Sequence, residues 1–461
     1  MLQKHALAVA VALLATAQPG LAQKYSTQKN SGVIGIWISP EEIMALPTSG
    51  PAWEKLKKLA DSDFGKAKGG HNDNHDVYTY GQALVAVRLN DDTYRAKVAA
   101  NVISAIGSED NGNVLSLARN LIGYVIAADL IDLKNFDPAK DAQFREWLAM
   151  VRHKELGGQG TLITIHEKRP NNFGTHATAA RAAAAIYLGD QADLERTAQV
   201  FKGWMGDRSS YAGFKYGDLS WQADPNNPVG INPVGATKQG RNIDGVLPDD
   251  QRRGGKFKWP PPKENYVYGA LQGALAAANI LHRAGYDAFN WENRALLRAY
   301  NWLHNVANFS PVGDDRWQLP MVDYIYGTNF WDGSLVKVGK NMGWTDWTHG
   351  ERGTATPITA IRGSVRNSQT NSGVENATVQ LRQDAQVKYE TNTNSQGQYS
   401  FNFIAAGTYE VTASRNGFEA SSASVTVAEG QEVTVDLVLN PVQDNEPPAP
   451  PRNPRVVEGN D

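Results

Sequence analysis

An amide and an imidazole stand four residues apart in the segment RPNNFGTH, residues 169–176. A helix is expected to follow directly, with the residues ATAAR. If that helix begins near Asn172, the side chains of Asn172 and His176 face the same way, because positions i and i+4 lie on one side of an α-helix. The two groups could then converge on a single carboxylate. The spacing therefore predicts a carboxylate-binding pair.

Residues 206–262 have little helical periodicity and carry aromatic side chains interleaved with basic ones. A loop this long inside a compact domain is usually functional. Aromatic rings stack on the apolar faces of sugars, and guanidinium groups bind carboxylates in a two-pronged manner. The segment thus suits a sugar polymer that bears carboxylates, although some of its side chains must pack on the domain or face water. The residues concerned are Tyr211, Phe214, Tyr216, Trp221, Trp259, Arg241, Arg252, Arg253, Lys256 and Lys258.

Around these residues the sequence resembles the alginate lyase superfamily of helical-toroid polysaccharide lyases. Those enzymes carry an Asn-Asn motif with a nearby His at the start of a barrel helix, and a Tyr and an Arg later in the chain. The resemblance spans roughly residues 53–349 and is nearest to the branch that includes glucuronan and mannuronate-type alginate lyases. Some branches place His directly after Asn, whereas Phe-Gly-Thr intervenes here. The similar segments are 169–176, 244–253 (DGVLPDDQRR), 266–273 (YVYGALQG), 283–287 (RAGYD) and 340–347 (KNMGWTDW).

The resemblance implies a β-elimination on a uronate. The C5 proton of a uronate is a poor acid while the neighbouring carboxylate is charged, so an enolate-like intermediate forms only if that charge is offset. Asn172, His176 and an Arg can offset it. One Tyr then takes the C5 proton and protonates the leaving O4. A tyrosine ordinarily has a pKa of about 10, so a cation such as Arg252 or Arg253 must favour its phenolate.

Tyr266 and Tyr268 compete for this acid–base role. They are two positions apart on an expected helix and therefore do not share a face. The resemblance favours Tyr266, and either tyrosine could instead be a packed residue with a satisfied hydroxyl. The resulting catalytic set is Asn172, His176, Tyr266 and Arg253.

A further group of residues is expected to bind substrate in the same cleft. His75 lies in the segment HNDNHD, residues 71–76, for which cleft lining ranks first, helix capping second and a divalent-metal site third. His349 could equally be a core or surface residue. Neither a metal nor another cofactor is expected. The expected substrate-binding residues are Asn171, His75, Arg241, Arg252, Tyr268, Trp221, Trp259 and His349.

The elements that must position these residues are mostly helices, from about residue 51 to about residue 308. Many antiparallel helices joined by short links predict stacked hairpins or an (α/α) toroid. The expected helices cover residues 53–60, 77–89, 93–106, 114–130, 141–151, 175–188, 194–204, 264–284 and 291–306.

The residue pattern changes near residue 361 to alternation in steps of two, which predicts a small all-β, immunoglobulin-like sandwich over residues 361–440. It resembles carboxypeptidase regulatory-like and Cna-B-type modules, through GSV (363–365), NATV (376–379), GQYSF (397–401) and AGTYEV (406–411). Such modules are mostly spacers or adhesion units, so this one could contact glycan or a cell surface. Residues 441–461 contain PPAPP and predict an extended linker or tail.

The first 22 residues resemble an export signal. Lys4 and His5 precede a short apolar run, and small residues lead to a cleavage site before Gln23. The run is too short for a stable membrane anchor, and a buried N-terminal helix is the alternative. We therefore expect a secreted or periplasmic protein without a membrane span, whose toroid domain covers residues 23–355.

Composition narrows the function further. The 461-residue chain has a net charge of −3, which argues against a generally basic nucleic-acid binder. It has no cysteine, which excludes thiol catalysis and cysteine-ligated zinc. The expected function is cleavage of polymannuronate, alginate or glucuronan. One alternative is an α/α-barrel glycoside hydrolase with paired carboxylates, for which Asp249, Asp250 and Asp244 are candidates. Another is a secreted glycan-binding protein without catalysis.

Overall fold

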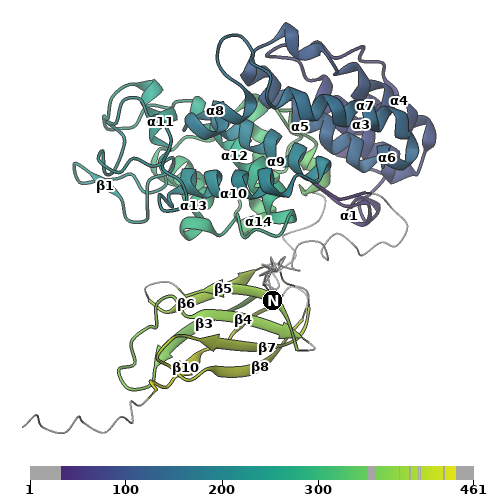
Figure 1. Cartoon of the computed structure of the whole chain (residues 1–461). Helices are drawn as coiled ribbons and strands as arrows, with labels where there is room; N and C mark the ends of the chain where they lie inside the picture. Colours follow the sequence, from purple (N-terminus) through teal and green to yellow (C-terminus); the bar gives the residue numbers. More distant parts are fainter. Residues whose placement is uncertain are drawn as a thin grey trace, which may run out of the picture. The chain divides into compact units, whose positions relative to one another are not determined.

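The computed structural model describes residues 33–350 and 360–442, except residues 384, 394–395, 403, 405 and 429–430. The chain divides into two compact units, Met1–Thr354 and Ala355–Asp461. The first is helical and the second is built of β-strands (Figure 1). This confirms the expected fold class, a helical domain followed by a β-sandwich. The expected export signal and nearly all of the expected tail lie outside the described residues.

Four long helices form the interior of the helical unit: α3 (His75–Leu89), α5 (Val114–Leu130), α9 (Asn172–Leu188) and α12 (Tyr266–Arg283). Every residue of α5 is buried, and most residues of the other three are buried as well. α5 packs against α3 on one side and α9 on the other, and α9 packs in turn against α12. The four helices therefore form a continuous inner row.

Amphipathic helices cover this row from outside: α2 (Pro51–Asp61), α4 (Asp92–Ser104), α7 (Pro138–Val151), α10 (Gln191–Met205) and α13 (Trp291–Asn301). In α2, for example, Trp53, Leu56 and Ala60 are buried while Glu54 and Lys58 are exposed. α2 and α4 pack on α3, and α10 packs on α9. A buried inner row with an amphipathic outer row is the layering of an (α/α) toroid.

Short elements complete the unit. Within the described residues, no helix is both long enough and apolar enough to cross a lipid bilayer. The short elements are α1 (Pro40–Met44), η1 (Ser108–Asn111), α6 (Leu133–Phe136), α8 (Leu162–Lys168), β1 (Thr237–Lys238), β2 (Arg241–Asn242), α11 (Pro248–Gln251), η2 (Arg252–Gly254), η3 (Trp302–Val306), η4 (Gly313–Trp317), α14 (Gln318–Tyr326) and α15 (Thr345–Thr348).

The segment of residues 34–46 binds the carboxyl ends of three inner helices. Asp129, near the end of α5, accepts hydrogen bonds from the backbone N–H groups of residues 34, 35 and 36, at 2.6, 2.9 and 2.9 Å. Arg283, the last residue of α12, donates to the Gly35 carbonyl at 2.5 Å. Arg88, near the end of α3, donates to the Leu46 carbonyl at 2.8 Å. These three helices therefore end on one side of the unit and begin on the other.

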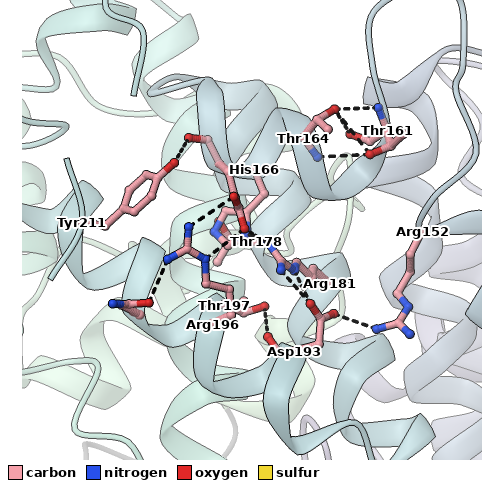
Figure 2. Close-up of polar contacts among 12 residues, drawn as sticks. Arg152, Thr161, Thr164, His166, Thr178, Arg181, Asp193, Arg196, Thr197 and Tyr211 are labelled. Carbon is pink, nitrogen blue, oxygen red and sulfur yellow. Dashed lines mark hydrogen bonds and ion pairs between the residues drawn. The ribbon is translucent and has the colours of Figure 1, made fainter. Parts of the chain in front are cut away.

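A buried ion-pair network fixes α9 against its outer neighbours (Figure 2). Arg181 of α9 donates to Asp193 of α10 through Nε and Nη2, at 2.8 and 2.6 Å, and through Nη1 to Glu167 of α8, at 3.1 Å. Asp193 also accepts from Arg152, which follows α7, at 2.7 Å. The Tyr211 hydroxyl donates to the Glu167 carbonyl at 2.6 Å, which attaches the start of the long 206–262 segment to the same network.

The second unit consists of two facing sheets. One has the order β10-β3-β6, with β9 also paired to β3, and the other has the order β5-β4-β7-β8. β9 and β10 run parallel to β3, whereas the remaining pairs are antiparallel. The unit has a hydrophobic core of its own. The strands are β3 (Ala360–Asn367), β4 (Thr378–Gln383), β5 (Gln386–Asn392), β6 (Gln398–Asn402), β7 (Gly407–Ser414), β8 (Ser421–Val427), β9 (Glu432–Thr434) and β10 (Leu437–Leu439).

Candidate active site

The start of α9 presents the Asn–His pair. Asn171 is the N-cap residue, and its side chain accepts a hydrogen bond from the Phe173 N–H at 3.2 Å. The helix begins at Asn172, so Asn172 and His176 lie one turn apart on the same face, as their spacing predicts. A side chain at Gly174 would overlap the Arg169 carbonyl, so glycine permits the close packing of α8 against this turn.

Three polar atoms of this pair lack a well-formed hydrogen bond in the described part of the chain, although the Gly269 backbone interacts with the His176 ring. Asn172 and His176 are fully buried, and Asn172 Oδ1 and both ring nitrogens of His176 lack a hydrogen bond of good geometry among the described residues. Burial, and then the positive charge of Arg119, hold the pKa of His176 well below its usual range, so the ring is neutral at neutral pH. A buried polar group without a partner costs about 1–3 kcal/mol. Such groups in a native fold indicate a site that a ligand completes.

Tyr266 and Tyr268 have opposite environments at the start of α12. Tyr266 is the first residue of the helix and is 43% exposed, and the Arg253 guanidinium carbon lies 3.4 Å from the centre of its ring. Tyr268 is completely buried and donates its hydroxyl to the Phe309 carbonyl at 2.6 Å. Burial raises the pKa of Tyr268. Tyr268 is therefore a core residue, and its expected contact with substrate is wrong.

Close packing of α12 against α9 places this region next to His176. Gly273 of α12 lies directly against the His176 backbone, and a Cβ at residue 273 would overlap the backbone nitrogen of His176. Gly273 is two helical turns from Tyr266. Tyr266 therefore lies about 10 Å along α12 from this contact, on the inner helix that packs against the Asn–His pair's own helix.

Arg119 of α5 lies in the same region, although it was not among the residues predicted for the site. Its side chain is 6% exposed, and its Nη1 lies 2.6 Å from Nε2 of His71. The charge of Arg119 interacts with both His176 and Tyr266. One signal was available in the sequence: Arg119 is the only basic residue in the mostly apolar stretch that forms α5.

The acidic residues before α12 hold the start of α9. Asp249 accepts from Asn171 Nδ2 at 2.9 Å and from Arg252 Nε at 2.7 Å. Asp250 accepts from the Asn172 N–H at 3.1 Å, and burial, followed by the charge of Asp249, raises the pKa of Asp250 well above its usual range. Asn171 and Arg252 thus help to position α9, and the substrate contacts expected for them stay predictions.

Trp221 and Trp259, the tryptophans expected to bind sugar in the 206–262 segment, differ in their exposure to solvent. Trp221 is completely buried, donates to the Gly255 carbonyl at 2.9 Å and packs against Phe257, so it is a core residue and its predicted stacking on sugar is wrong. Trp259 is partly exposed, and the Arg241 guanidinium carbon lies 5.5 Å from the centre of its ring. Arg241 and Trp259 remain available to a ligand.

His75 and His349 do not have the expected roles. His75 is buried, and both of its ring nitrogens are engaged, Nδ1 by the Tyr124 hydroxyl at 2.9 Å and Nε2 by the Gly65 carbonyl at 3.0 Å. His349 packs edge-on against Trp37. The Trp37 carbonyl accepts from Asn279, which lies 13 residues, or about 20 Å, along α12 from Tyr266. Both predicted substrate contacts are therefore wrong.

Among residues 33–350 and the described part of 360–442, no three His, Cys, Asp or Glu side chains are grouped so that they could hold a metal ion.

Comparison with protein families matches two parts of the chain. Residues 110–209 match the alginate lyase family, and residues 360–440 match the carboxypeptidase regulatory-like domain. Both expected resemblances are thereby confirmed. The alginate lyase match includes Arg119, Asn172 and His176 and ends before Arg253 and Tyr266. It supports a polysaccharide lyase activity in general, and hence a polysaccharide substrate.

Comparison with individual proteins adds little. No curated protein matches the chain. The Bacillus anthracis TIE protein is 13% identical, over 19% of this chain and 17% of its own, with a TM-score of 0.17. The Klebsiella pneumoniae 5-hydroxyisourate hydrolase is 19% identical, over 18% of this chain and 85% of its own, with a TM-score of 0.16. GBS52, the minor pilin of Streptococcus agalactiae, is 14% identical, over 20% of this chain and 49% of its own, with a TM-score of 0.17.

Proposed function

We propose that the protein cleaves a uronate-containing anionic polysaccharide, polymannuronate, alginate or glucuronan, by β-elimination. The observation that carries this proposal is the buried Asn172–His176 pair, three of whose polar atoms lack a well-formed hydrogen bond among the described residues, in the same region as a tyrosine stacked on an arginine. Amide and imidazole groups can donate to a carboxylate, and the exposed phenol can exchange protons with a bound sugar. The alginate lyase match supports the same class of reaction.

In the proposed reaction the substrate carboxylate lies against Asn172 and His176. Because His176 is neutral in the free protein, it acts there first as a hydrogen-bond donor. Tyr266, whose ring lies under the Arg253 guanidinium, removes the C5 proton as its phenolate. The C4–O4 bond then breaks, a C4=C5 double bond forms, and the Tyr266 hydroxyl returns the proton to O4. The products are a new non-reducing end with an unsaturated uronate and a free hydroxyl on the other fragment.

The carboxylates considered for a hydrolase are engaged in structural contacts. Asp249 and Asp250 hold the start of α9, as described above, and Asp244 pairs with Arg298 at 2.5 Å. A glycosidase needs one carboxyl group as acid and another as base or nucleophile on either side of the bond. These contacts favour elimination over hydrolysis.

The products test the proposal. The protein is incubated separately with polymannuronate, alginate, glucuronan and hyaluronan, and new ends are followed by ultraviolet absorbance and by reducing-end assay. We expect absorbance and reducing ends to rise together on at least one of the first three polymers. Reducing ends without absorbance would indicate a hydrolase, and binding without a loss of viscosity would indicate a glycan-binding protein.

We also propose that the protein is exported, with a mature chain that begins near Gln23, and that the β-sandwich contacts glycan or a cell surface. The charged start, short apolar run and small-residue site support export. N-terminal sequencing of protein collected outside the cytoplasm is expected to begin near Gln23, and exported protein that begins at Met1 would contradict the proposal.

A further inference from the structure

Arg119 is a buried cation that forms no ion pair with any residue the structure describes. Its side chain donates through Nη1 to His71, and Nε is buried without a hydrogen bond. Within the described residues, no carboxylate oxygen lies within ion-pair distance of the guanidinium. The nearby acids are engaged elsewhere: Asp314 pairs with Lys340 at 3.3 Å, and Asp315 accepts from Gln272 and Asn265 at 2.6 and 3.0 Å.

Such an arrangement is costly for the folded protein. Burial lowers the pKa of Arg119 to about 10, which still leaves the group charged at neutral pH. Removing a charge from water is unfavourable unless an opposite charge and hydrogen bonds compensate for it. The imidazole of His71 and the more distant charges of Asp314 and Asp315 compensate only in part, since burial still lowers the pKa of Arg119, so the guanidinium attracts an anion that reaches it.

His71 fixes the orientation of the guanidinium. Since arginine only donates hydrogen bonds, His71 must accept through Nε2 and carry its own proton on Nδ1. Burial, and then the charges of Arg119 and Lys340, lower the pKa of His71, which keeps it neutral. With Nη1 engaged, Nε and Nη2 form the free edge of the guanidinium, and two parallel donors on one edge match the two oxygens of a carboxylate.

Arg119 also lies where the substrate carboxylate is needed. It extends from α5, the inner helix next to α9, and its charge interacts with both His176 and Tyr266. Lys340 adds a second cation from another direction: its backbone N–H donates to Gln272 of α12 at 2.9 Å, and its Nζ donates to Asn72 at 3.2 Å. An anion between the Asn–His pair and Tyr266 would therefore meet Arg119.

We propose that Arg119 binds the carboxylate of the uronate whose C5 proton faces Tyr266, and that His71 positions the Arg119 guanidinium. The inference rests on the proposed function and assigns the two arginines to different parts of the reaction. Arg119 offsets the charge of the carboxylate as it becomes enolate-like, whereas Arg253 lies over the ring of Tyr266. Because the charge on the carboxylate oxygens grows in the transition state, losing Arg119 should lower kcat more than it raises KM.

The test compares Arg119→Met with a matched control, Arg152→Met. Arg152 is equally buried but is paired with Asp190 and Asp193 away from the site. We expect Arg119→Met to reduce kcat by about 10²–10³-fold, with a melting temperature equal to or above that of the wild type. Arg152→Met should melt at a lower temperature and keep its kcat. A lower melting temperature with unchanged kcat in Arg119→Met would make Arg119 a structural residue and overturn the inference.

A binding measurement separates this inference from the proposed function. Calorimetry in the Tyr266→Phe background compares mannuronate and glucuronate tetrasaccharides with their carboxyl-reduced forms. We expect the preference for the acidic forms to fall at least tenfold when Arg119→Met is added. If polymer is cleaved but this preference persists, the inference fails alone. If the preference depends on Arg119 but no polymer is cleaved, the proposed function fails alone, and if neither binding nor cleavage occurs, both fail.

Discussion

At the scale of single residues, Tyr266 and Tyr268 allow a controlled comparison because each can lose only its hydroxyl. Tyr266→Phe should reduce turnover by at least the ~10²–10⁴-fold typical of a general acid–base group. Its folding should be unaffected, because the Tyr266 ring is exposed and keeps its stacking partner. Initial rates of unsaturated-end formation, with substrate binding measured in parallel, check this expectation.

The matched variant is Tyr268→Phe. It removes the hydrogen bond to the Phe309 carbonyl, so it should lower the free energy of unfolding by about 1 kcal/mol and leave turnover nearly unchanged. An inactive Tyr268→Phe beside an active Tyr266→Phe would move the acid–base role by two residues. Full activity of both would remove the single-tyrosine mechanism and point to His176 as the base.

His176 gives a prediction about pH. Its pKa in the folded protein lies well below the usual value of about 6.5, because of burial and then Arg119. As the pH falls below about 6.5, the unfolded chain therefore takes up this proton first, and the fold loses stability until the pH reaches the folded-state pKa. His176→Gln should lose less stability over this range, by up to about 1.4 kcal/mol for each pH unit.

The measurement is the wild-type minus His176→Gln difference in the free energy of unfolding from pH 7.5 to pH 5. The difference cancels the contribution of His166, which has the same sign. It also cancels the contributions of Asp76 and Asp250, whose raised pKa values give the opposite sign. A difference that stays constant across this range would contradict the prediction.

Residue types alone distinguished the proposed site residues from structural residues only in part. The i, i+4 spacing of Asn172 and His176 carries geometric information, so the sequence could place both on one helical face. Trp221, His75 and His349 are of residue types that commonly bind sugars. Only tertiary packing shows that their side chains are buried and contact other parts of the protein. Arg119 was missed because its nearness to His176 depends on how α5 packs against α9.

At the scale of elements, the position of α9 depends on Asp193, which holds both Arg181 and Arg152 (Figure 2). Asp193→Ala would leave Arg181 with Glu167 as its remaining acidic partner in a buried environment. Removing one member of a buried pair typically costs about 3–5 kcal/mol. Denaturant unfolding should show a loss of this size.

The control is Asp92→Ala, which removes an exposed partner of Arg95 at the start of α4. Surface pairs contribute about 0–1 kcal/mol, so this variant should unfold nearly as the wild type does. Equal effects of the two substitutions would show that the network does not stabilise α9.

The elements themselves were largely predictable where local signals exist. The α5 helix matches its expected range of 114–130, because the Asn113 cap and the apolar stretch act locally. The α9 helix begins three residues earlier than expected, because Asn171 caps it and Asp250 binds its first N–H group. The course of the 206–262 segment was not predictable, since distant contacts such as that of Tyr211 with Glu167 determine it.

At the scale of the whole molecule, the two units should be separable. Removing the chain after about residue 360 is expected to leave activity on soluble polymer largely intact, because the proposed catalytic residues all precede that point and the β-sandwich has its own core. Steady-state rates of the truncated and full-length proteins check this. A folded, truncated protein without turnover would show that the β-sandwich contributes to the site.

The division into two units was visible in the sequence as a change from helical to two-residue periodicity near residue 361. The pairing of β9 and β10 with β3 was not visible, because parallel pairing joins strands about 70 residues apart and carries no local signal.

The segment of residues 34–46 has a practical consequence. The Gly35 carbonyl binds Arg283, the last residue of α12, whereas Tyr266 is the first. A helix of this length spans about 27 Å. The chain therefore enters the helical unit at the end opposite to the proposed site. A purification tag, or a covalent link to a bead, can be attached ahead of this segment and leave the approach of a long polymer to Tyr266 open.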